Sequence, residues 1–455
     1  MDAGVKAALA YVQHWLAHHV RLTQQPGCAI AVAHKGRVVL ERAYGHADLI
    51  KGRKLTPRHR FRAASHSKSF TAAGIMLLRE RGLLRLDDPV GQYVDRLHPQ
   101  VAETTIAQAL SHSAGLIRDG VDAGQWQDRR PFANERDLRR ALAGPLVIDA
   151  STRFKNSNHG FGLIGLVMEA ITGERYVDWI TREVIAASKL TETTPDVPAA
   201  KGGPMARGHS GRLPLGRRVV IPGDNPTHAL APAAGFVSTA ADLARFFASL
   251  DPAASRSILT PASRREMVRR HWRDDQSSIG QHYGLGITIG RTGDWDWFGH
   301  GGGFQSCLSR TIVLPGRDLS VSVLTNAVDG FANPWSDSVI NILRFFAARG
   351  APTAKTRDWT GRWWRLWGPV DLVPVRDHAV VAWPGMFNPF MDASEIEITG
   401  RDRGRLRRGS GFGSPGEPVR LVRNANGNVS DVWLGGTKYV SEARAAAELK
   451  RNYEG

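Results

Sequence analysis

Cysteine is scarce in this chain of 455 residues, which contains only two, Cys28 and Cys307. Each lies in an apolar run and the two are far apart in sequence, which argues against a disulfide framework and against a cysteine nucleophile. The 16 histidines include no H-E-x-x-H or comparable ligand set. We therefore expect neither a metal nor another cofactor.

Long apolar runs are also missing. No stretch of 18 uncharged apolar residues occurs, so no segment is expected to span a membrane. Residues 1–22 place apolar residues at roughly helical spacing, but they lack the charged start, the uninterrupted apolar run and the cleavage site of a signal peptide. We find no repeat and no low-complexity tract. We expect a cytoplasmic protein.

Acidic side chains are in the minority: 43 Asp and Glu stand against 60 Lys and Arg, for a net charge of +17. Such an excess attracts nucleic acids and other anionic surfaces. The arginines are nevertheless scattered, with local concentrations at 264–273 and 401–408 and no basic and aromatic array. We interpret the excess as a solvated basic surface rather than a nucleic-acid site.

The rest of the composition, 42% apolar and 23% charged, is typical of a soluble globular protein longer than one ordinary domain. After Gly350 the pattern changes to short β-like runs separated by glycine-rich turns. These runs are 370–375, 379–383, 395–398, 419–423 and 430–434. We predict two domains, 1–350 and 356–455, of which the second is all-β, a small sandwich or barrel.

The first domain begins with an apparent hairpin and ends with apparent strands. Residues 28–44 form two apolar runs around Lys35-Gly36, and residues 304–326 form two more around Pro315-Gly316. Apolar spacing predicts helices at 65–82, 104–111, 135–143, 159–172, 239–250 and 335–348. We expect one antiparallel sheet that joins both ends of the domain, with helices packed on it, an α+β arrangement.

The sequence SHSK, from Ser65 to Lys68, is an S-x-x-K element at the start of an apolar helix. Residues at i and i+3 share a helix face, so the amine can reach the hydroxyl, and the helix N-terminus favours developing negative charge. A desolvated lysine loses pKa and can act as a base. Taken alone, the pattern also fits an N-cap serine followed by a solvated lysine.

Several further segments along the chain have the character of motifs. Together with residues 61–94 they are LSHSAGL at 110–116, FKNSNHGFGLIGLVMEAITG at 154–173, APAAGFVSTAADLARF at 231–246, HYGLG at 282–286 and FGHGGGFQS at 298–306. This set resembles the serine β-lactamase and penicillin-binding-protein family, including class C β-lactamases, family VIII esterases and D-aminopeptidases. The resemblance covers about residues 8–348 and implies a β-lactamase/transpeptidase-like fold with Ser65 as nucleophile and Lys68 as its activating partner.

The family's second motif is Y-x-N, and Asn158 matches its asparagine while Asn156 replaces its tyrosine. In the family that tyrosine shuttles protons, which an amide cannot do. Lys68 alone, His159 or Tyr283 are the alternatives for this task. Without the resemblance, Asn158 is also interpretable as a loop residue that caps the next helix.

The family's third motif has the form H-x-G in its esterase and aminopeptidase branches, which His300-Gly301-Gly302 fits. Glycines at such a strand let a substrate backbone approach closely, and a histidine there can bind a carboxylate or assist proton transfer. The resemblance implies that the backbone amides of Ser65 and Gly303 form the oxyanion hole, with Gly302 and Asn156 beside the substrate. Taken alone, a histidine beside glycines is usually structural.

These residues predict a serine hydrolase that acts on a peptide, amide or ester through an acyl-enzyme on Ser65, with Asn158 and His300 orienting the substrate. The H-G-G form and the extra β domain resemble D-aminopeptidase-like and esterase-like relatives more than β-lactamases. The expected partner is a small molecule or a short peptide. The alternatives are a β-lactamase, a penicillin-binding-protein-like binding protein weakened by Asn156, and a nucleic-acid binder.

Overall fold

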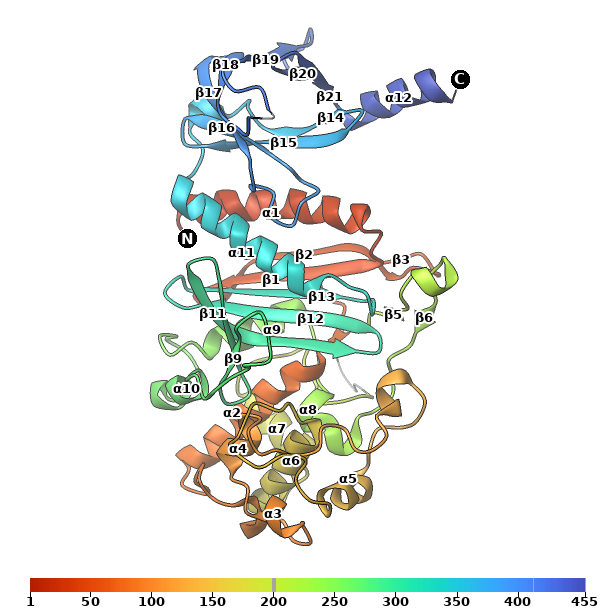
Figure 1. The fold of residues 1–455 in the computed structure, drawn as a ribbon, viewed down its shortest axis with the longest axis vertical. Helices are drawn as coiled ribbons and strands as arrows, with labels where there is room; N and C mark the ends of the chain where they lie inside the picture. The colour runs from red at the N-terminus through yellow and green to blue at the C-terminus, as the bar shows by residue number, and fades with distance from the viewer. Residues whose placement is uncertain (199–201, 412, 455) are drawn as a thin grey trace. The chain divides into compact units, whose positions relative to one another are not determined.

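The computed structural model describes residues 1–198, 202–411 and 413–454. Its chain divides into two compact units (Figure 1). One unit comprises residues 25–336, and the other comprises residues 1–24 with the chain from 337 onward. The domain boundary expected at 350–356 stays a prediction. The division into compact units places residues 1–24, which contain the first helix, with the C-terminal region.

An antiparallel sheet is the framework of residues 25–336 (Figure 1). Its described strands, in sheet order, are β3 (Arg53–Lys54), β2 (Arg37–Asp48), β1 (Gly27–His34), β13 (Leu319–Thr325), β12 (Cys307–Leu314), β11 (Trp295–Phe304), β10 (Thr288–Thr292), β9 (His282–Tyr283) and β8 (Trp272–Arg273). Cys28 pairs with Thr325 and Ala33 with Ser320 where β1 meets β13. The predicted sheet, in which the early hairpin joins the late strands, is confirmed.

Helices cover this sheet and extend beyond it. They are α2 (Ser67–Glu80), α3 (Pro99–Ala102), α4 (Ile106–Leu110), α5 (Glu135–Leu142), α6 (Asn158–Thr172), α7 (Tyr176–Ile180), α8 (Ala231–Ala234), α9 (Ala240–Ser249) and α10 (Pro261–Met267). Helix α9 packs on β1, β12 and β13, and α2 packs on α6 and α8. Two short ladders complete the unit: β4 (Phe61–Arg62) pairs with β7 (Val237–Ser238), and β5 (Gly208–His209) with β6 (Val220–Ile221).

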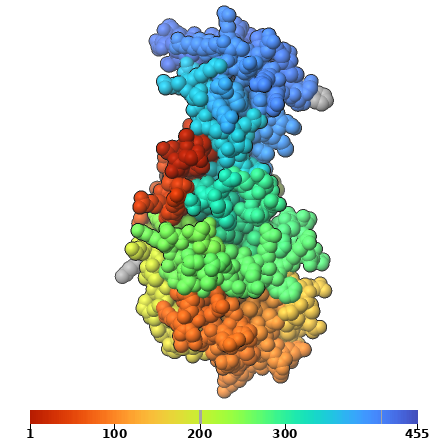
Figure 2. Space-filling model, turned by 90° about the vertical axis from the view of Figure 1, so that its left-hand side faces the viewer, coloured from red at the N-terminus to blue at the C-terminus, as the bar shows by residue number. Residues whose placement is uncertain are grey.

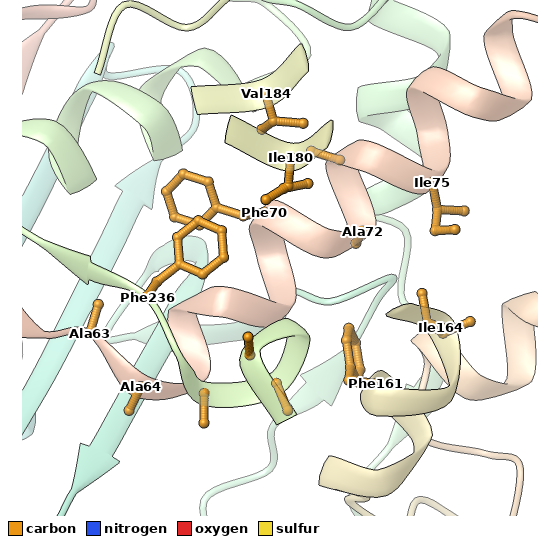
Figure 3. Close-up of a cluster of buried hydrophobic side chains, with 14 of the residues drawn as sticks. Ala63, Ala64, Phe70, Ala72, Ile75, Phe161, Ile164, Ile180, Val184 and Phe236 are labelled. Atoms are coloured by element: carbon orange, nitrogen blue, oxygen red, sulfur yellow. The ribbon is translucent and has the colours of Figure 1, made fainter. Parts of the chain in front are cut away.

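The buried side chains of α2 hold that helix in place (Figure 3). The Phe70 ring stacks on Phe236 and Phe246, with centroids 4.4 and 3.7 Å apart. Ile75 of α2 and Phe161 of α6 belong to the same apolar core. Figure 2 shows orange and green segments of this unit next to one another. Helix α10 also packs against α2. The N-terminus of α2, where the S-x-x-K element lies, therefore has a rigid support.

The second unit contains a closed barrel of eight described strands. They are β14 (Gly361–Arg365), β15 (Gly368–Val375), β16 (His378–Ala382), β17 (Ser394–Gly400), β18 (Arg403–Arg408), β19 (Pro418–Arg423), β20 (Val429–Leu434) and β21 (Thr437–Val440). Its interior is apolar and includes the fully buried Trp359. The predicted all-β region is confirmed as a barrel, and closure removes the exposed sheet edges.

The described α-helices of this unit are α1 (Ala3–Leu22), α11 (Ala332–Arg349), most of which belongs to this unit, and α12 (Glu442–Tyr453). Tyr11 of α1 donates a hydrogen bond to Asp371 at 3.0 Å, and Arg362 pairs with the same carboxylate at 2.7 Å. Burial and the neighbouring Asp371 carboxylate raise the pKa of the Tyr11 phenol. Within the described residues, no helix combines the length and the hydropathy needed to cross a bilayer.

Candidate active site

A tight turn presents Ser65 just before α2. Residues Ala64–His66 form a 3₁₀ turn, and Ala64 adopts a φ of 49°, a left-handed conformation that is strained for a residue with a Cβ. The Ser67 hydroxyl donates to the Ala64 carbonyl at 2.6 Å and accepts from the Phe236 amide at 3.0 Å. The helix expected over 65–82 begins two residues later and ends at Glu80, and Gly82 closes it in a left-handed conformation with a φ of 71°.

Lys68 is buried, with 1% of its surface exposed, and its amine has three oxygen neighbours. Nζ lies 3.0 Å from Ser65 Oγ, 2.8 Å from Asn158 Oδ1 and 3.1 Å from the Ala233 carbonyl. Burial lowers the pKa of Lys68 to about 7, while the carboxylate of Asp119 opposes the shift. The amine is therefore substantially neutral at physiological pH.

The neighbours of Lys68 determine where the lone pair of the neutral amine points. The Ala233 carbonyl and Asn158 Oδ1 can only accept hydrogen bonds, so they take the two N–H groups of a neutral amine. The lone pair is then left facing Ser65 Oγ. In this state the serine hydroxyl donates to Nζ, which is the geometry that a general base requires.

Asn158 is held in the orientation that this arrangement needs. Its Nδ2 donates to Asp119 Oδ1 at 2.7 Å, which leaves Oδ1 for Lys68. Trp126 Nε1 donates to the same Asp119 oxygen at 2.8 Å, and Arg118 Nε lies 3.1 Å from the other. Asn158 is the first residue of α6, and Ser157 is the residue that caps the helix. The alternative of Asn158 as a capping residue is therefore wrong.

His300 of β11 faces Tyr283 of β9. His300 Nδ1 lies 2.6 Å from the Gly301 carbonyl, and its Nε2 lies 2.8 Å from the Tyr283 hydroxyl. Because a carbonyl only accepts, Nδ1 carries the proton and Nε2 accepts from the phenol. Burial, followed by the positive charge of Lys68, lowers the pKa of His300 to about 3, so the imidazole is neutral.

A cavity of about 220 Å³ joins these groups. It is lined by Ser65, Lys68, His112, Phe154, Asn156, Asp274, Gln281, His282, Tyr283, Thr288, His300 and Gly301. Asn158 contacts the cavity's Lys68 directly. Thus the serine, the lysine, both asparagines and the histidine expected from sequence come together at one place.

The glycines that follow His300 are placed differently from the cavity-lining residues. Gly301 lines the cavity, whereas Gly302 and Gly303 are absent from its described lining. A Cβ on Gly302 would lie 2.2 Å from the Ala63 carbonyl, so this position must be glycine for β11 to approach the turn before Ser65. The contribution of the Gly303 amide to an oxyanion hole stays a prediction.

Two carboxylates of the site were missed by sequence reasoning. Asp119 follows LSHSAGL by three residues and reaches Lys68 only through the fold. Asp274 lies in the turn between β8 and β9, and no pattern in the sequence links it to Ser65. The described residues hold no group of three histidine, cysteine or carboxylate side chains suited to bind a metal ion.

Comparison with known proteins identifies the family. The model of the Beta-lactamase family matches residues 12–339. The chain belongs to this family. Protein flp of Staphylococcus aureus (strain MRSA252) is 28% identical over 182 residues, which are 39% of this chain and 36% of that protein. The match thus spans little more than a third of this relative's length.

Solved structures share the fold at low sequence identity. The octameric penicillin-binding protein homologue from Pyrococcus abyssi has a TM-score of 0.65 and 19% identity, covering 95% of this chain and 99% of that one. The D-amino acid amidase from Ochrobactrum anthropi SV3, complexed with D-phenylalanine, has a TM-score of 0.63 and 20% identity, covering 76% and 99%. The β-lactamase/transpeptidase-like fold of this family member is therefore shared by structures of both kinds.

Proposed function

We propose that this member of the Beta-lactamase family is a serine hydrolase that transfers an acyl group from an amide or ester to Ser65 and then to water. The observation that carries the proposal is the environment of Lys68, whose neutral amine turns its lone pair towards Ser65 Oγ. The amine accepts the hydroxyl proton while Oγ attacks the substrate carbonyl carbon. The protonated amine then donates to the leaving nitrogen or oxygen.

An active-site fluorophosphonate probe tests this proposal, because it reacts covalently only with an activated hydroxyl. We expect the wild-type chain to be labelled on Ser65 and Ser65→Ala to stay unlabelled. Ser69→Ala is the matched control: Ser69 lies on the same helix but donates to the Gly286 carbonyl at 2.6 Å, so labelling should persist. A folded wild-type chain that resists the probe would overturn the proposal and favour a binding protein.

Asp274 favours a substrate that carries a free amino group. Its half-buried carboxylate lines the cavity, and among the described residues no basic side chain forms an ion pair with it, whereas Asp275 beside it pairs with Arg273 at 3.3 Å. A substrate ammonium group would supply the missing positive charge. We propose a small aminoacyl amide or short peptide, a class consistent with the fold shared with the D-amino acid amidase.

A substrate screen separates this class from simple esters. We expect alanine p-nitroanilide, in its D or L form, to have a KM at least about tenfold below that of its N-acetyl analogue, because one charge-assisted hydrogen bond contributes roughly 1.5 kcal/mol or more. Asp274→Asn should remove this difference, and the control Asp275→Asn should keep it. Equal KM values for both anilides with the wild-type chain would count against the aminoacyl class and leave an esterase-like substrate.

A further inference from the structure

The cavity contains a phenol although the family's usual tyrosine position holds Asn156. Tyr283 lies on β9, where it pairs in register with Thr288 of β10, and both residues line the same cavity as Ser65. The side chain is buried, with 6% of the residue exposed. Its hydroxyl is the donor to His300 Nε2 described above. A titratable oxygen therefore stands at the site from a strand far from position 156 in sequence.

His300 gives this phenol a direction for its proton. Since the Gly301 carbonyl occupies Nδ1–H, only the lone pair of Nε2 is available to the Tyr283 hydroxyl. The lone pairs of the phenol oxygen are then free to accept a proton from a molecule in the cavity. The pair is thus arranged to take up a proton from the cavity, which would pass first to Tyr283 and then to His300.

We propose that Tyr283 and His300 form the proton relay that activates water for release of the acyl group, while Lys68 serves formation of the acyl-enzyme. This inference rests on the proposed serine hydrolase function. It divides the two half-reactions between two different bases. Tyr283 would touch the reacting water and is the catalytic residue of the pair, whereas His300 acts through Tyr283.

Every proton is accounted for in both half-reactions. In acylation, Ser65 Oγ bonds to the carbonyl carbon, its proton passes to Lys68 Nζ, and the bond to the leaving group breaks as Nζ returns that proton to the leaving atom. In deacylation, water bonds to the ester carbon and passes one proton to Tyr283 Oη, whose own proton moves to His300 Nε2. Collapse of the tetrahedral intermediate breaks the bond to Ser65 Oγ, which receives the proton back through Tyr283.

The charge of Lys68 favours this order of events. Burial is the largest cause of the low pKa of His300, and the positive charge of Lys68 is the next. Once Lys68 has returned its proton to the leaving group, the amine is neutral and this second cause is removed. The imidazole is then a stronger base in the acyl-enzyme than in the state with a protonated lysine.

His159, the other replacement considered from sequence, is not placed for this task. Neither of its ring nitrogens has a hydrogen-bond partner among the described residues, and it is absent from the described lining of the cavity. A Cβ on Gly120 would lie 3.3 Å from its Cε1, so it packs against that segment. Tyr283, which lines the cavity, is therefore the better placed of the two.

Rapid mixing with p-nitrophenyl acetate tests whether Lys68 serves acylation while Tyr283 and His300 serve release of the acyl group. We expect Tyr283→Phe to release the first equivalent of p-nitrophenol within about threefold of the wild-type rate. Later turnovers should slow by about 100-fold, the usual size of a lost general base. Intact mass measurement should show an acetyl group retained on the protein. Loss of the first turnover and of later turnovers to the same extent, or no change in either, would overturn the relay.

Three further variants distinguish loss of the relay from a merely structural effect of Tyr283→Phe. Tyr93→Phe removes a phenol that donates to Asp88 at 2.6 Å outside the cavity, and it should behave as wild type. His300→Gln keeps an acceptor for the phenol but cannot take up a proton, so it should also retain the acetyl group. Asn156→Tyr added to a folded Tyr283→Phe should restore release by at least tenfold, and no recovery would count against the relay. If Tyr283→Phe does not fold, His300→Gln decides: release of the acetyl group by this variant at the wild-type rate would overturn the relay.

The outcome also separates this inference from the proposed function. If no variant and no wild-type sample forms an acyl or phosphonyl adduct on Ser65, the hydrolase proposal itself fails. If Ser65 is acetylated and Tyr283→Phe releases the acetyl group at the wild-type rate, only the relay fails.

Discussion

Two cations, one from each compact unit, lie in opposite environments. In the unit of residues 25–336, Lys68 is buried beside a serine hydroxyl and has a lowered pKa. In the barrel, strand β18 alternates exposed arginines such as Arg403 and Arg405 with the buried Leu406. A net charge of +17 therefore says little about function. Chemistry arises where the fold takes one cation out of water beside a group that can react with it.

The difference is also visible in the partners of these cations. Lys68 contacts three oxygens at 2.8 to 3.1 Å from three separate segments. Arg405 lies opposite Glu397 in the barrel ladder, where a solvated pair contributes little. Replacing Lys68 should thus affect activity strongly, and replacing Arg405 should hardly affect it.

The largest expected effect comes from removing the amine of Lys68. Lys68→Met keeps the length of the side chain but removes the base, so phosphonylation of Ser65 should slow by about 10³-fold. The rate of fluorophosphonate labelling measures this. Lys438→Met on β21 is the control, since Lys438 is 40% exposed and lies 3.5 Å from Asp431. Labelling of Lys68→Met within threefold of wild type would contradict the role assigned to the lysine.

The next effect concerns the barrel core rather than its charged surface. Trp359 is fully buried and donates its indole N–H to the Arg401 carbonyl at 3.2 Å. Trp359→Ala should lower the free energy of unfolding of the barrel transition by about 3 to 5 kcal/mol, measured by urea denaturation. Trp367→Ala is the matched control, since that side chain is 86% exposed and should change the value by less than about 0.5 kcal/mol. Equal losses would contradict this description of the barrel interior.

A smaller effect is expected in the pH dependence of stability. In the unfolded chain Lys68 keeps its proton up to its usual pKa of 10.5, whereas in the folded chain it releases it near pH 7. Between these values the unfolded state binds more protons, so the free energy of unfolding rises with pH, by at most about 1.4 kcal/mol per pH unit. Urea denaturation from pH 7 to 9 should show this slope in wild type and lose it in Lys68→Met. An unchanged slope would contradict the lowered pKa.

The smallest effect is expected on the surface of the barrel. Arg405→Ser replaces an exposed arginine on the outward face of β18, so the free energy of unfolding should change by less than about 0.5 kcal/mol. The same denaturation measurement at pH 7 checks this. A loss above about 1 kcal/mol would show that the basic surface of the barrel is structural and would weaken the contrast between the units.

Periodicity predicted the elements whose burial is regular. The hairpin at 28–44, the helix of the S-x-x-K element and the strands around Pro315-Gly316 all occur near their expected positions. Strands β14, β18 and β21 were missed, because GRWWR, RGRLRR and TKYV contain too few apolar residues at regular spacing to stand out. Closure of the barrel forms these strands by pairing each with its neighbours.

The residues of the site also fall into those that were predicted from the sequence and those that were missed. Ser65 and Lys68 were predicted because their spacing is local, and Asn158 and His300 because they lie in family motifs. Asp119 and Asp274 were missed, since each enters the site from a loop whose course depends on contacts distant in sequence.

The sequence by itself determined that Ser65 and Lys68 lie one turn apart where a helix begins, because side chains at i and i+3 of a continuous helical turn lie on the same side of it. Only the tertiary structure decided that this lysine loses its proton near neutral pH and that Tyr283 faces His300. Both depend on which distant segments exclude water and supply oxygen or nitrogen neighbours, and the spacing of residues along one chain does not contain that information.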